Sequence, residues 1–132
     1  MILTYGQIHD ARRGLTIILG AQKRNIPTIP KFKLARMHDV LDPLFNPLEE
    51  FRIGLIHKYG EEQFADEAKT VSVGWQLGQN TDKYKEFEKE WEEFRAQTQE
   101  VSVTPIPLAS FGDVSDGLDV AEFKLLGPLV TE

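Results

Sequence analysis

The chain of 132 residues contains no cysteine. Disulfide bonds, thiolate metal sites and cysteine nucleophiles are therefore excluded together. Long hydrophobic runs are also missing, because no apolar stretch approaches the roughly 20 residues that a bilayer requires. Near the start of the chain, Asp10, Arg12 and Arg13 interrupt the pattern of a signal peptide, and no small-residue cleavage site follows. We therefore expect a protein that is made and kept in the cytoplasm, or packaged from it, and that has no membrane partner.

Recognisable motifs for catalysis and cofactor binding are missing as well. The three histidines form no zinc-ligand pair, and none lies beside a serine in a nucleophile-elbow sequence. Nothing places the acid pair Asp39 and Asp42 in a cleft, where acid–base chemistry would need it. Asp113, Asp116 and Asp119 lack the alternate ligands and the final glutamate of an EF-hand, so they are better interpreted as a solvated turn. The sequence predicts a protein that is not an enzyme and that binds no cofactor or metal.

The net charge of -6 conceals a strong division along the chain. Residues 1–60 carry nine Lys and Arg against five Asp and Glu, whereas residues 61–132 carry six against sixteen. No acid lies between Arg12 and His38. This basic stretch could bind nucleic-acid phosphates, pair with acidic residues of the same chain or of another copy, or simply be solvated. Because the whole chain is acidic and would repel nucleic acid, we favour pairing of this stretch with the glutamate-rich helix predicted after residue 81, either within one molecule or head to tail between copies.

The most regular pattern lies in residues 31–60. Its apolar residues repeat every three and four positions, which places them on one face of a helix. We call these residues the leucine seam; they are Leu34, Met37, Leu41, Leu44, Leu48, Phe51 and Leu55. Pro43 and Pro47 fall inside this pattern and predict a strong kink or a short break around residues 43–46, while Gly60 is predicted to end the helix.

Two further helices are predicted on either side of this one. Thr4 and Gln7 have the form of a capping box, which predicts that a first helix starts there and fades over residues 20–25. The proline-containing segment 25–30 is predicted to be a non-helical linker. A second stripe predicts a helix that begins at Thr81 or Asp82 and buries four rings against the leucine seam. These rings belong to Tyr84, Phe87, Trp91 and Phe94.

Extended structure is predicted near both ends and in the middle of the chain. Alternation over residues 71–77 predicts a weak strand or arm, in which Trp75 is the aromatic residue expected at an interface, and residues 61–69 are expected to form a loop. Residues 101–108 are predicted to form an edge strand that pairs with the N-terminal Ile2 and Leu3. Residues 120–126 are predicted to form a last short helix. The predicted fold is a single α+β domain over residues 1–132, with a kinked long helix packed on an aromatic-faced acidic helix and a small antiparallel sheet from the chain ends.

Several segments together resemble a family of small phage and prophage proteins with a domain of unknown function. The resemblance covers roughly residues 30–130 and is most specific at the turn Lys58-Tyr59-Gly60-Glu61, which ends the long helix. Other matching segments are Leu34 to Arg36, Leu48 to Arg52, the stripe from Tyr84 to Phe94, and Val101 to Leu108. The family has no established activity, so the resemblance assigns no functional residue. It implies an origin in a phage or an integrated prophage.

These observations predict a non-enzymatic bacteriophage protein that acts through protein contacts in virion structure or assembly. Its expected partners are further copies of the chain or other phage proteins, and its expected location is the virion or the host cytoplasm. The alternative is an inhibitor that binds a bacterial enzyme or defence complex through its acidic surface, and the third reading is a small nucleic-acid binder. The residues predicted to make the contacts are Arg12, Arg13, Lys23, Arg24, Trp75, Glu86, Glu90 and Glu93.

Overall fold

The computed structural model describes residues 1–20, 26–78, 81–111 and 124–131, and it confirms the α+β class. Its helices are α1 (Tyr5–Gly20), α2 (Thr28–Tyr59), α3 (Asp82–Arg95) and the short 3₁₀ helices η1 (Leu108–Phe111) and η3 (Gly127–Leu129). Its strands are β1 (Ile2–Thr4), β2 (Glu61–Phe64), β3 (Ser72–Gln76), β4 (Thr98–Glu100), β5 (Ile106–Pro107) and β6 (Val130–Thr131). Among the residues described, no helix combines the length and hydropathy needed to cross a bilayer.

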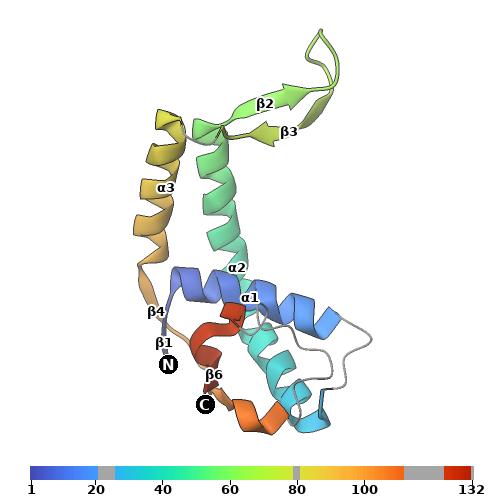
Figure 1. Cartoon of the computed structure of the whole chain (residues 1–132), viewed down its shortest axis with the longest axis vertical. Helices are drawn as coiled ribbons and strands as arrows, with labels where there is room; N and C mark the ends of the chain where they lie inside the picture. The colour runs from blue at the N-terminus through green and yellow to red at the C-terminus, as the bar shows by residue number, and fades with distance from the viewer. Residues whose placement is uncertain (21–25, 79–80, 112–123, 132) are drawn as a thin grey trace.

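Helix α2 runs along most of the long axis of the molecule (Figure 1). The α1 helix crosses its lower half, where the two chain ends also lie, and α3 runs beside its upper half (Figure 1). The β2–β3 hairpin projects from the upper end, away from both helices (Figure 1). The molecule therefore has a compact lower body, a two-helix arm and a projecting hairpin.

The hydrophobic core lies in the lower body, where α1 packs on α2 and on the C-terminal segment. Ile8, Leu15, Leu34 and Leu41 are each 0% exposed, which shows that the leucine seam of α2 is covered mainly by α1. The other members of this core are Leu3, Ala11, Ile18, Met37, Leu48, Val101, Ile106, Phe111, Leu126 and Leu129. Burial of this apolar surface is the main stabilising contribution in the fold.

The start of α1 confirms the predicted capping box. The Thr4 backbone N–H donates to Gln7 Oε1 at 2.9 Å, and the Gln7 N–H donates to Thr4 Oγ1 at 3.0 Å. Two N–H groups that the helix itself cannot satisfy are therefore paired by side chains. The same logic holds at α3, where Thr81 Oγ1 accepts from the Tyr84 N–H at 3.1 Å.

Helix α2 corrects two predictions about proline. It starts at Thr28, inside the expected linker, because Pro30 falls in the first turn, where a missing N–H costs no helical hydrogen bond. The predicted short break is wrong, since α2 is continuous through Pro43 and Pro47. Figure 1 shows the helix bending where α1 crosses it. Packing of the seam on both sides of the prolines holds one helix together at this point.

The aromatic stripe of α3 packs on α2, but its predicted burial is wrong. All four rings are only partly buried, and α3 contains no fully buried residue. Phe94 stacks on Phe51 with ring centroids 3.8 Å apart and an interplanar angle of 15°. Phe51 nevertheless remains 39% exposed, because no further layer covers the two-helix arm in the described part of the chain.

The strands form three separate pairs rather than one sheet. The N-terminal β1 pairs antiparallel with β4, with Ile2 opposite Glu100, so the expected partner over residues 101–108 is wrong. The short β5 pairs instead with β6 in parallel. Residues 61–64, expected in a loop, form β2 and pair with β3. The predicted turn at 113–119 lies outside the described residues, as does most of the predicted last helix, of which residues 124–126 are helical.

Candidate interaction surfaces

The β2–β3 hairpin is the most exposed regular structure in the described chain. Glu61 lies opposite Gln76 and Phe64 lies opposite Ser72, with a register irregularity at Gln63 and Phe64. Neither strand pairs with a third strand among the described residues. Each strand therefore presents one row of backbone N–H and C=O groups to solvent, which is the surface that strand addition uses.

The hairpin also exposes apolar side chains at alternate positions, one just before its second strand and two within it. Val71 is 54% exposed, Val73 63% and Trp75 39%. A two-stranded ribbon is at best marginally stable in water by itself, and here it has no apolar layer beneath it. Exposed apolar residues on a projecting ribbon make the hairpin a candidate contact surface.

The loop at the tip of the hairpin is organised by one carboxylate. Asp66 Oδ1 accepts from the Thr70 N–H at 2.9 Å and from the Val71 N–H at 3.1 Å, and Asp66 Oδ2 accepts from the Thr70 hydroxyl. The hydrogen bond from the Thr70 side chain is the largest cause that lowers the pKa of Asp66. The tip is therefore a structured turn, although it lies far from the core.

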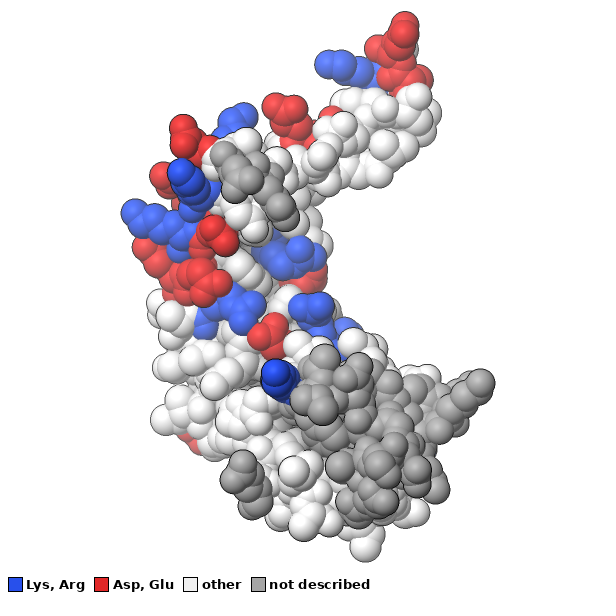
Figure 2. Space-filling model, viewed as in Figure 1, with Lys and Arg blue, Asp and Glu red and all other residues white. Residues whose placement is uncertain are grey.

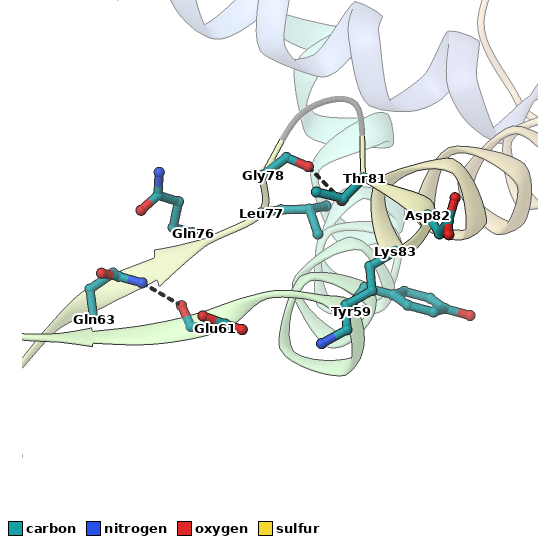
Figure 3. Close-up of a pocket in the computed structure, with 9 residues that line it drawn as sticks. All are labelled: Tyr59, Glu61, Gln63, Gln76, Leu77, Gly78, Thr81, Asp82 and Lys83. Carbon is teal, nitrogen blue, oxygen red and sulfur yellow. Dashed lines mark hydrogen bonds between the residues drawn. The ribbon is translucent and has the colours of Figure 1, made fainter.

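The base of the hairpin is joined to α2 through an aromatic stack. The rings of His57 and Trp75 lie 4.3 Å apart, at an interplanar angle of 29°. Beside this junction lies an open cavity of about 420 Å³, between the base of the hairpin and the start of α3 (Figure 3). Gln63 and Gln76 lie at its hairpin side and Lys83 at its helix side (Figure 3). The stack thus holds the second strand of the hairpin against the last turn of α2.

A second exposed surface, the basic apolar patch, lies at the start of α2. It consists of Ile29, Phe32, Lys33 and Arg36, all exposed, with Ile29 at 70% and Phe32 at 62%. The Arg36 guanidinium lies 5.8 Å from the centre of the Phe32 ring. Figure 1 shows this part of α2 at the opposite end of the long axis from the hairpin.

The structure separates the basic residues that the sequence grouped together. Arg12 donates from Nε and Nη2 to Asp42 Oδ1 at 3.0 Å and 2.8 Å, and its guanidinium lies 4.3 Å from the Phe45 ring centre. Arg13 is exposed and has no hydrogen-bond or ion-pair partner among the described residues. Lys23 and Arg24 lie outside the described residues. Arg12 is thus committed to α2 rather than to the glutamates of α3.

The predicted acidic residues all lie on α3, in two different situations. Glu90 accepts from Lys58 Nζ at 3.1 Å and joins α3 to α2, while Glu86 and Glu93 are exposed. Figure 2 shows acidic and basic side chains interspersed over α3, so this face does not carry a single sign of charge.

Two features were missed by sequence reasoning, and each had a weak signal. The basic apolar patch was visible as apolar Ile29 and Phe32 among basic residues and outside the leucine seam. The second strand of the hairpin was predicted, but its partner was not, because β2 has the polar sequence Glu-Glu-Gln-Phe. The hairpin could therefore be recognised only once the structure showed that the two strands pair.

The fold defines the chain as an α+β protein with a projecting hairpin. The chain matches no protein-family model, no curated protein and no solved structure. Functional inference therefore depends on the surfaces themselves.

Proposed function

We propose that this is a non-enzymatic assembly protein whose copies join head to tail. The β2–β3 hairpin of one copy docks on the basic apolar patch of the next. The observation that carries the proposal is the projecting hairpin with Val71, Val73 and Trp75 exposed. Contact with a second copy would remove this apolar surface from water, which is the main favourable contribution in most protein associations.

The charges of the two surfaces are complementary. Residues 61–76, which include both strands of the hairpin, contain four acids and one lysine. Residues 26–38, which include the basic apolar patch, contain three basic residues and no acid. Opposite charge steers the two surfaces together and fixes their register, while the apolar residues supply affinity. This match is the reason for choosing a second copy as the partner.

A contact between two different surfaces of one protein is heterologous. Such contacts produce rings when the rotation between copies closes and filaments when it does not. Both outcomes suit a structural component of a particle. The resemblance to small phage and prophage proteins supports placing this assembly in a virion, with the host cytoplasm as the place where it begins.

The first experiment is light scattering of the full chain over a range of concentrations, at low salt and at about 0.5 M salt, where surface charges are largely screened. We expect oligomers at low salt that dissociate as salt is raised. Val73→Ser should weaken the association, whereas Ile53→Ser, which alters an exposed apolar residue of α2 outside both surfaces, should not. A chain that stays monomeric under all conditions would overturn the proposal.

A charge exchange tests the pairing itself. Lys33→Glu with Arg36→Glu should abolish association, and so should Glu62→Lys with Glu67→Lys. Mixing the two variants should restore association in which the variants alternate, because the reversed hairpin meets the reversed patch and the unchanged hairpin meets the unchanged patch. If mixing leaves both variants monomeric, the hairpin does not dock on this patch.

The second candidate function is a host-directed inhibitor. It is favoured by the exposed glutamates along α3, namely Glu86, Glu88, Glu92 and Glu93. An inhibitor should be a monomer or a small closed oligomer and should be missing from purified particles. The same light-scattering experiment therefore separates the two candidates.

A further inference from the structure

A second cavity, of about 350 Å³, lies where α1 crosses α2 and α3. All three helices contribute to its wall, which is formed by His9, Arg13, Phe45, Glu49, Arg52, Trp91 and Arg95. Figure 2 shows basic side chains with acidic ones among them on this face, at about the level where Figure 1 shows α1 crossing α2. The cavity belongs neither to the hairpin nor to the basic apolar patch.

The cavity wall carries three arginines and one carboxylate. Arg52 donates from Nε to Glu49 Oε1 at 2.9 Å and also through Nη2, and Arg95 donates from Nη2 to Asp10 Oδ2 at 2.8 Å. These pairs fix two guanidinium groups in place but leave some of the five N–H donors of each group unused. Arg13 has no partner among the described residues. The wall therefore presents the unpaired guanidinium of Arg13 beside those of Arg52 and Arg95, which are held in position by carboxylates.

His9 forms the buried end of this network. It is 3% exposed, and its Nε2 lies 2.6 Å from Glu49 Oε2, to which it donates because an ionised carboxylate can only accept. Its ring stacks on Phe45 at 4.9 Å and meets Trp91 edge-on at 5.5 Å. Its Nδ1 is buried without a hydrogen-bond partner in the described structure, and Asp10 Oδ1 is 3.8 Å away. The His9 ring is thus held in place by two aromatic rings and by Glu49.

We propose that this cavity binds a small organic molecule that carries a phosphate group. Planar guanidinium groups match the oxygens of a phosphate, which accepts paired N–H bonds, and three of them converge here. The partly buried ring of Trp91 provides an apolar surface for the rest of the ligand. The volume lies at the lower end of the range for small-molecule sites, which suits a metabolite rather than a folded partner.

Isothermal titration calorimetry on the full chain tests this proposal with phenyl phosphate, inorganic phosphate and phenol as probes. Phenyl phosphate should bind at one site per chain and more tightly than inorganic phosphate, and phenol should give no saturable heat. Arg13→Gln should weaken phenyl phosphate binding about tenfold or more, as expected when a hydrogen bond to a charged group is lost. Because Arg13 is exposed and has no described partner, this variant should keep the fold.

The matched control is Lys89→Gln, which removes one positive charge from an exposed position of α3 outside the cavity and outside both docking surfaces, and it should leave binding unchanged. A second variant, Trp91→Phe, should weaken phenyl phosphate more than inorganic phosphate, because it shortens the ring that would contact the organic part of the ligand and removes none of the three arginines. Equal losses in Arg13→Gln and Lys89→Gln would show non-specific attraction of anions and overturn the proposal. Absence of saturable binding by either phosphate probe would overturn it as well. So would tighter binding of a single-stranded oligonucleotide that depends equally on Arg13 and Lys89.

Discussion

Gly60 and Gln76 approach so closely that a β-carbon added to Gly60 would lie 3.0 Å from the carbonyl oxygen of Gln76 and 2.6 Å from that of Ile56. The backbone of Gly60 is extended, with φ of -89° and ψ of 176°, so the glycine is required by space and not by a left-handed conformation. The end of α2 and the base of the hairpin meet at a point where no side chain fits.

Gly60→Ala should therefore destabilise the junction. Backbone atoms on both sides cannot move as a flexible side chain would, and we expect a loss of about 1–3 kcal/mol in the free energy of unfolding. Gly54→Ala is the matched control, because nothing lies within 4 Å of its added β-carbon, and it should stabilise α2 by about 0.5–1 kcal/mol. Urea unfolding of the two variants measures both effects, and equal changes in the same direction would contradict this interpretation.

Trp75→Ala should loosen the hairpin without unfolding the body. The substitution removes the ring that stacks on His57, while the core around α1 does not contain either residue. Hydrogen exchange should become faster in residues 61–76 and remain unchanged in α1. Trp75→Phe keeps a ring at this position and should retain most of the protection. If exchange accelerates equally in α1, the hairpin is not an independent unit.

Lys69→Gly should stabilise the tip of the hairpin. Lys69 has φ of 57°, a conformation that costs a residue with a side chain roughly 1 kcal/mol and costs glycine little. We expect slower hydrogen exchange at the amides of Thr70 and Val71, which Asp66 holds. Asp66→Ala should have the opposite effect, because it removes the acceptor of both amides. A slower exchange in both variants would contradict the proposed role of the carboxylate.

The protein should lose stability in acid, because the stabilising ionised form of Glu49 becomes protonated. Its pKa is lowered to about 2, first by the hydrogen bond with Arg52 and then by that with His9, although partial burial opposes the shift. A lowered pKa in the folded state means that the stabilising effect is complete above the ordinary value of 4.5. It is lost progressively as the pH falls from about 4.5 to about 2.

Urea midpoints measured at pH 6 and near pH 2 test this expectation. Glu49→Gln should be clearly less stable than the wild type at pH 6, and the difference should shrink at the lower pH. Glu88→Gln, at an exposed position of α3, serves as the control and should show little difference at either pH. A difference for Glu49→Gln that does not change with pH would contradict the assigned role.

The local signals in the sequence predicted the helices well. Thr4 with Gln7, and Thr81 before Tyr84, mark helix starts through hydrogen bonds that span only three residues, so the local sequence contains the information needed to predict them. The leucine seam predicted α2 because its spacing of three and four residues is also a property of one continuous segment. Its continuity through Pro47 was not predictable, because packing on α1 and α3 outweighs the local cost of proline.

Features that depend on distant residues could not be predicted. Arg12 pairs with Asp42, thirty positions away, so its charge is not available together with the other basic residues of the stretch. The polar strand β2 exists only because β3 pairs with it. His9 carried no local signal at all, since its importance comes from Glu49 and Trp91, which other helices bring to it. The cavity is therefore a product of the helix crossing.

Helix α2 connects the two surfaces of the proposed assembly. A helix of 32 residues measures about 48 Å, which makes α2 the spacer that fixes the axial repeat between successive copies. Any change in direction at Pro43 and Pro47 would be repeated in every copy along the assembly. The bend in this one helix would then determine whether a row of copies runs straight, coils, or closes into a ring of defined diameter.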